Sequence, residues 1–123
     1  MKQITTLVDD MYEVIRGEGG WDGTSGSLLG NGIALTANQR FSKPQEPRGY
    51  LSLSSVGTAC RRKLWYKVNK STEAEPLGAN TLLKFFFGDM IEELALTVAL
   101  AAGHDVKGQQ GKLNVHGIKG HRD

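Results

Sequence analysis

The longest apolar stretch of the chain, residues 81–102, constrains the fold most, because it is long enough for one helix of about six turns. Four charged residues interrupt this stretch and make it a poor candidate for a membrane span. We predict a helix from about residue 80 to residue 102, ending at Gly103. The interrupting residues are Lys84, Asp89, Glu92 and Glu93.

A shorter amphipathic helix is predicted near the N-terminus. Residues 3–16 carry apolar side chains at three- and four-residue spacing, with acidic residues on the remaining face, and Gly17 is a suitable stop. Because acidic residues break the segment, it is neither a signal peptide nor a membrane anchor. The apolar stripe consists of Ile4, Leu7, Val8, Met11, Tyr12 and Ile15.

Glycine, serine and proline characterise the segment between this helix and residue 50. Residues 17–31 show no periodicity and predict a connector. A short helix or turn is expected at 32–40, and an extended linker at 41–50. We therefore divide the chain into an N-terminal part, 1–50, and a second part, 51–123.

The second part begins with serines that suit a helix N-terminus. Leu53, Val56, Cys60 and Leu64 follow at helical spacing and predict an apolar face. Guanidinium groups bind phosphates bidentately and aromatic rings stack on unpaired bases, so the opposite face is a candidate for contact with DNA. That face carries Arg61, Arg62, Lys63, Trp65, Tyr66 and Lys67.

Short β-strands are expected near the C-terminal end of the sequence. Residues 113–121 are typical of a hairpin, with His116 and Gly117 as its turn. The predicted fold class is therefore α/β, with helices first and strands last.

The charge and the cysteine content indicate more about the cellular compartment of the protein than about its activity. The net charge of +2 and the isoelectric point of about 8.8 neither require nor exclude a nucleic-acid partner. The single cysteine, Cys60, cannot form an internal disulfide, which fits a reducing cytoplasm. The three histidines lack the spacing of a zinc site, and we expect His104 and His116 in surface turns.

Two carboxylates are the candidate metal ligands. Glu92 lies one helical turn after Gly88, a residue that permits close approach of another backbone. Asp123 lies at the end of the second predicted strand. Carboxylate oxygens are the hard ligands that Mg²⁺ takes, so the two residues predict a divalent-metal site.

In order and spacing, these segments resemble phage-type exonucleases of the PD-(D/E)XK superfamily, in the RecB-like group that includes CRISPR-adaptation nucleases. The resemblance covers roughly residues 50–123. LSLSSVGTACRRKLWY is similar to the first core helix of the family, and FGDMIEELALTVALAAGHDV to the helix that carries motif I. GIKGHRD is similar to the strand that ends in the motif II aspartate. Motif III, E-x-K, does not follow, so we expect the start of a restriction-endonuclease-like mixed sheet whose core is truncated.

The resemblance implies a Mg²⁺- or Mn²⁺-dependent DNA exonuclease that hydrolyses phosphodiester bonds in phage recombination or replication, in the cytoplasm of a bacterial host. Glu92 and Asp123 would be its catalytic metal ligands, and the chain by itself is expected to be inactive. DNA is the implied partner, with a homo-oligomer or a phage recombination protein as an unspecified addition. The resemblance assigns Ser54, Ser55, Arg61 and Arg62 to DNA phosphates, and His121 and Gly88 to support of the site.

Simpler interpretations exist for these residues. Helix glutamates such as Glu92 are usually solvated, and charge runs such as 61–67 usually form a solvated face. Trp65 and Tyr66 fit packing on the core better than base stacking. The three consecutive phenylalanines, Phe85, Phe86 and Phe87, are expected in the core.

Cys60 has an alternative of its own. Some relatives place a cysteine near this helix in a 4Fe-4S cluster. Because the sequence has no second cysteine, we expect Cys60 to be a buried, small apolar residue instead. For the chain as a whole, two alternatives to a nuclease stay open, namely a non-catalytic DNA-binding module and a helical protein-interaction domain.

Overall fold

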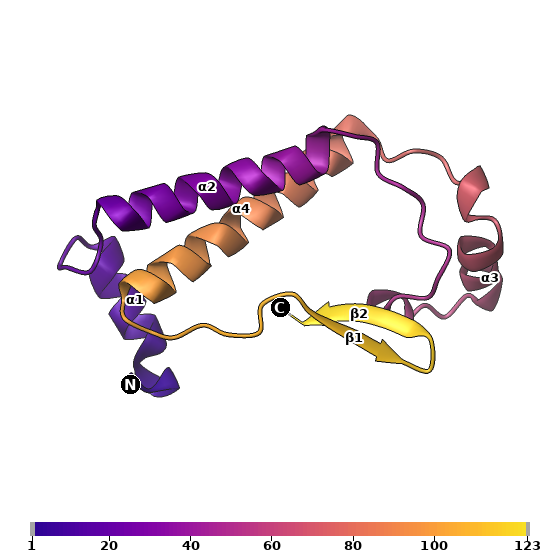
Figure 1. The fold of residues 1–123 in the computed structure, drawn as a ribbon. Helices are drawn as coiled ribbons and strands as arrows, with labels where there is room; N and C mark the ends of the chain where they lie inside the picture. The colour runs from indigo at the N-terminus through magenta and orange to yellow at the C-terminus, as the bar shows by residue number, and fades with distance from the viewer. Residues whose placement is uncertain (1, 123) are drawn as a thin grey trace. The chain divides into compact units, whose positions relative to one another are not determined.

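A computed structural model describes residues 2–122 of the chain. The described residues form a mixed α/β fold in which helices precede a small antiparallel sheet, as the sequence predicts (Figure 1). The helices are α1 (Leu7–Ile15), α2 (Gly23–Phe41), α3 (Arg61–Asn69) and α4 (Ala79–Ala101), with short 3₁₀ turns at Ile4–Thr6, Leu53–Ser55 and Ser71–Glu73. The strands are β1 (Gly111–Val115) and β2 (Ile118–Arg122).

Two compact units divide these elements. The first, which we call the helical unit, consists of the chain up to Pro44 together with Gly78–Lys107. The second, the hairpin unit, consists of Gln45–Leu77 together with the chain from Gly108 onward. Both units are discontinuous in sequence. Helix α4 packs against α1 and α2 in the helical unit, and the segment Gln45–Leu77, which separates α2 from α4 in the chain, belongs to the hairpin unit.

Helix α1 forms where the apolar pattern predicts it, and part of the predicted stripe faces the core, since Leu7 is half-buried and Met11 packs against the core. Val14 is its most buried residue at 7% exposure, whereas Ile4, Val8 and Ile15 of the expected stripe are 83%, 58% and 65% exposed. Val14 packs with Val98 and Ala102 of the α4 end, in a small core of short side chains. The helix period was therefore correct, and the assignment of the buried face was right for Leu7 and Met11 but wrong for Ile4, Val8 and Ile15.

The glycine-rich segment expected as a connector contains the first nine residues of α2, and the short helix or turn expected at 32–40 forms its second half. Asp22 begins this helix with a capping box, since its side chain accepts a hydrogen bond from the Ser25 backbone (2.8 Å) while the Asp22 backbone donates to the Ser25 hydroxyl. The backbone hydrogen bond from Ser25 lowers the pKa of the Asp22 carboxyl. Glycine disfavours an isolated helix, so the stability of α2 comes from this cap and from packing on α4.

Helices α2 and α4 lie side by side and run antiparallel (Figure 1). A Cβ on Gly32 would collide with the Glu93 side chain of α4, so the lack of a side chain at Gly32 makes room for Glu93. At the other end, Arg40 forms a bidentate ion pair with Asp89 (2.5 and 2.9 Å) that raises the pKa of the guanidinium. The space that a glycine leaves is therefore filled at Gly32, and not at Gly88, where a Cβ would meet no described atom within 4 Å.

The three consecutive phenylalanines do not all enter a core, contrary to expectation. Phe86 packs edge-on against Phe41 of α2 with ring centroids 5.1 Å apart. Phe85 and Phe87 are 44% and 59% exposed. Successive helical residues point about 100° apart, so α2 cannot cover all three rings. Besides Phe86, it reaches Phe85 through the Arg40 guanidinium, which lies 5.4 Å from that ring centroid.

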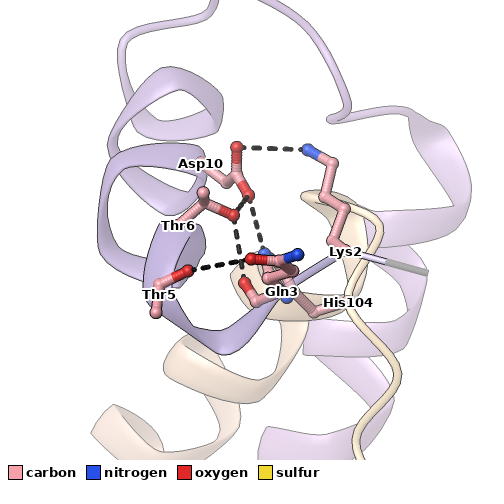
Figure 2. Close-up of polar contacts among 6 residues, drawn as sticks. All are labelled: Lys2, Gln3, Thr5, Thr6, Asp10 and His104. Atoms are coloured by element: carbon pink, nitrogen blue, oxygen red, sulfur yellow. Dashed lines mark hydrogen bonds and ion pairs between the residues drawn. The ribbon is translucent and has the colours of Figure 1, made fainter.

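His104, expected in an exposed turn, is one of the better-buried polar side chains of the helical unit. Its side chain is 8% exposed, and Nε2 lies 2.8 Å from Oδ2 of Asp10 on α1. The Thr6 hydroxyl donates to the same carboxylate oxygen (2.8 Å), and the Lys2 ammonium lies 3.3 Å from the other oxygen (Figure 2). These contacts join α1 to the residues that follow α4, and we call them the Asp10 clasp.

The bond from Thr6 is the largest of several effects that lower the pKa of the Asp10 carboxyl, followed by the bond to His104. The ionised form of Asp10 is therefore the form that the clasp favours.

Candidate nucleic-acid interface

Charge is unequally divided between the two units. By sequence, the hairpin unit has nine Lys and Arg against four Asp and Glu, a net charge of +5. The helical unit has six against nine, a net charge of −3. The small net charge of the whole chain therefore conceals a strongly basic unit, and a polyanion would be attracted to the hairpin unit.

A cluster of serine hydroxyls forms the interior of the hairpin unit. Ser52 and Ser55 are 7% and 4% exposed, and their hydroxyl oxygens lie 2.6 Å apart. The Lys67 ammonium of α3 donates to Ser55 (2.6 Å), and Ser52 is 2.9 Å from the hydroxyl of Ser54. Lys67, Ser55, Ser52 and Ser54 therefore form one hydrogen-bonded run in which each hydroxyl has a partner.

Strand β2 packs against this serine segment. The Lys119 backbone donates to the carbonyl of Leu51 (3.0 Å), next to a parallel bridge between Ser52 and Lys119. Gly120 lies against the Leu53 side chain with no room for a Cβ. The hairpin itself has the predicted turn, in which His116 and Gly117 have φ of 50° and 82°, the left-handed pair typical of a type I′ turn.

A hollow of about 140 Å³ opens where β2 meets the serine segment. This volume is well below the few hundred Å³ of a pocket for a drug-sized ligand, and it suits a small charged group better. Among the lining residues that the structure describes there are two cations and no carboxylate. The lining residues are Arg48, Tyr50, Ser52, Leu53, Ser54, Lys119, Gly120 and His121.

The chemistry of this hollow is that of an anion site. Arg48 and Lys119 supply positive charge, and the Ser54 hydroxyl and the His121 ring supply hydrogen-bonding groups. The Lys119 ammonium lies 4.9 Å from the Tyr50 ring centroid, a cation–π contact that holds the lysine at the rim. We call these residues the phosphate pocket, because phosphate oxygens are acceptors with the matching charge.

Two of the residues singled out in the sequence meet in this pocket, since Ser54 and His121 both line it. Ser55 instead lies in the interior, bonded to Ser52 and Lys67. Arg48 and Lys119 were not singled out. No periodic pattern marks them, because the segments that carry them meet only through a bridge between positions 52 and 119. The only signal in the sequence was that each of these two segments contains a cation.

Helix α3 begins later than expected, which changes the position of Cys60. The segment before it forms the 3₁₀ turn Leu53–Ser55 and a loop, and α3 itself starts at Arg61. Cys60 is therefore the residue at the N-terminal boundary of α3 and is exposed, so the expectation of a buried cysteine on an apolar helix face was wrong. Leu53, Val56 and Cys60 do not form the apolar face of a helix, because no α-helix spans them.

The basic and aromatic residues of α3 lie at the surface of the hairpin unit. Arg61 and Arg62 are exposed, and neither lines the phosphate pocket. Trp65 and Tyr66 are 54% and 46% exposed, so the expectation that these rings pack on the core was wrong.

Only one of the two expected metal ligands lies among the described residues. Glu92 is half-buried on α4 in the helical unit, whereas Asp123 lies outside the described residues. Within residues 2–122, no three His, Cys, Asp or Glu side chains are grouped so as to hold a metal ion.

Comparison of the chain with protein-family models, with curated proteins and with solved structures finds no match. Among the described residues, no helix is both long and apolar enough to cross a membrane.

Proposed function

We propose that the chain binds DNA through its hairpin unit and takes part in DNA hydrolysis by a metal-dependent exonuclease of the PD-(D/E)XK type. The phosphate pocket is the observation that carries the DNA-binding part, since it combines Arg48, Lys119 and the Ser54 hydroxyl in the basic unit. Phosphate contacts provide most of the affinity of proteins for DNA and position the strand. In this proposal one phosphate occupies the pocket, and β1 and β2 are the first strands of the nuclease sheet.

The hydrolytic part of the proposal rests on the sequence resemblance. Glu92 and Asp123 are its metal ligands, and Mg²⁺ or Mn²⁺ supplies an activated water when bound. Among the described residues, those of the phosphate pocket bind and orient the substrate phosphate in this proposal. DNA binding and DNA cleavage are therefore tested separately.

The double variant Arg48→Ala/Lys119→Ala is expected to bind DNA about 10–100-fold more weakly, because two charge-assisted contacts are lost. The slope of log K against log salt should fall by about two. Fluorescence anisotropy of a labelled oligonucleotide at several salt concentrations measures both quantities. The matched control is Arg16→Ala/Lys107→Ala, which removes two exposed cations from the acidic helical unit. Equal losses in the two double variants would contradict the assignment of the pocket.

Cleavage is tested on the product of the complete reading frame, incubated with linear DNA and Mg²⁺. Digestion is expected, and Glu92→Gln should slow it by at least about 10-fold while leaving DNA binding unchanged. Lys84→Gln, an exposed charge change on the same helix, is the control. Salt-dependent binding without digestion would instead favour the non-catalytic DNA-binding alternative.

A further inference from the structure

Two aromatic rings on α3 are unusually accessible for their size. Trp65 is 54% exposed and Tyr66 is 46% exposed on a helix of nine residues. Large aromatic side chains carry a strong driving force for burial, and they are enriched where a partner covers them. The pair is therefore a candidate contact surface within the hairpin unit.

The two rings hold each other in a defined arrangement. Their centroids lie 5.2 Å apart at an interplanar angle of 89°, an edge-to-face contact. One turn earlier, the Arg62 guanidinium lies 5.7 Å from the Tyr66 ring centroid and reaches its hydroxyl at 3.5 Å. Tyr66 is thus braced from two directions, and the half-exposed indole of Trp65 is the ring that remains accessible to a planar ligand.

The charge around these rings selects the class of ligand. Helix α3 contains Arg61, Arg62, Lys63 and Lys67 and no acidic residue, within a unit of net charge +5. An apolar protein surface would gain nothing from this charge, whereas a nucleic-acid strand carries one negative charge per nucleotide. Aromatic rings beside cations bind unpaired bases by stacking.

We infer that α3 is a stacking platform for single-stranded DNA, in which a base lies on the Trp65 indole and Arg61, Arg62 and Lys63 contact the flanking phosphates. In duplex DNA each base is already stacked on its neighbours, so Trp65 gains little from a duplex. This inference rests on the proposed function, because it assigns the single-stranded part of a DNA substrate to α3 and a backbone phosphate to the phosphate pocket.

The chain allows a direct optical test, since it has two tryptophans, one in each unit. In a Trp21→Phe background, Trp65 is the sole indole, and titration with oligo(dT) is expected to quench its fluorescence through base stacking. A duplex of equal length should quench it much less. Trp65→Ala should weaken oligo(dT) binding about 5–100-fold and leave duplex binding within about twofold, as measured by anisotropy. Trp65→Phe, which keeps an aromatic face, should retain most of the affinity.

The matched control is Trp21→Ala, which removes the 43% exposed tryptophan of the helical unit and should leave both affinities unchanged. Circular dichroism of each variant confirms that α3 and the other helices are retained. Equal weakening of single-stranded and duplex binding by Trp65→Ala, or no quenching by oligo(dT), would overturn the stacking platform. If binding then still depended on Arg48 and Lys119, the proposed function would stand without it; absence of all DNA binding would overturn both.

Discussion

Replacement of Gly20 with alanine is expected to lower the free energy of unfolding of the helical unit by about 2–5 kcal/mol. Gly20 has a φ of 83°, which costs a residue with a Cβ roughly 1–2 kcal/mol. A Cβ there would also lie 2.6 Å from the carbonyl oxygen of Ala101 and 3.0 Å from a methyl of Val14. The backbone oxygen belongs to the end of α4, so relief of the clash requires the loop between α1 and α2 to move away from α4.

The measurement is urea denaturation followed by the fluorescence of Trp21, the neighbouring residue, in a Trp65→Phe background. Gly26→Ala is the matched control, because it adds the same methyl to α2 where no described atom lies within 4 Å. Alanine is a better helix former, so this control should gain about 0.5–1 kcal/mol. Equal effects of the two substitutions would contradict the close approach of Gly20 to α4.

Replacement of His104 with alanine is expected to destabilise the helical unit by about 2–3 kcal/mol. The imidazole is only 8% exposed, so its removal leaves a cavity as well as a carboxylate without its partner at 2.8 Å. The loss should appear in the same denaturation experiment. His116→Ala, in the exposed hairpin turn, removes the same group from the hairpin unit and should change stability of the helical unit by less than about 0.5 kcal/mol.

The Asp10 clasp also gives the helical unit an acid-sensitive contribution to stability. The pKa of the Asp10 carboxyl is lowered from its ordinary value of 3.8, so the unfolded chain takes up this proton at a higher pH than the folded chain does. The contribution is complete above about pH 4 and is lost as pH falls through the folded-state pKa. In Asp10→Asn, stability should therefore depend less on pH below 4, whereas Glu13→Gln, which removes a different α1 carboxylate, should keep the dependence of the original chain.

Local signals were sufficient for three elements of the fold. The apolar period of α1, the long interrupted apolar stretch of α4 and the His116–Gly117 turn each act within a few residues, and each element forms where it was predicted. The first half of α2, at 23–31, was missed for a physical reason: glycines disfavour a helix in isolation, and this segment becomes helical through its cap and its packing on α4.

The candidate site divides in the same way. The serines, cations and aromatic rings of the hairpin unit are evident as residue types, and Ser54 and His121 were singled out before the fold was known. Their meeting with Arg48 and Lys119 depends on the bridge between Ser52 and Lys119, which lie far apart in the sequence. The roles of Glu92 and Asp123 as metal ligands stay predictions.

By itself, then, the sequence determined the helices and the hairpin with strong local periods, together with the residue types available for binding a phosphate. Tertiary structure alone decided the burial of His104, the exposure of Cys60 and the grouping of charge into a basic and an acidic unit. The reason is that these properties depend on contacts between distant segments. A local pattern indicates which face of a helix is apolar, but it does not specify which distant segment covers that face, or which loop pairs with a strand.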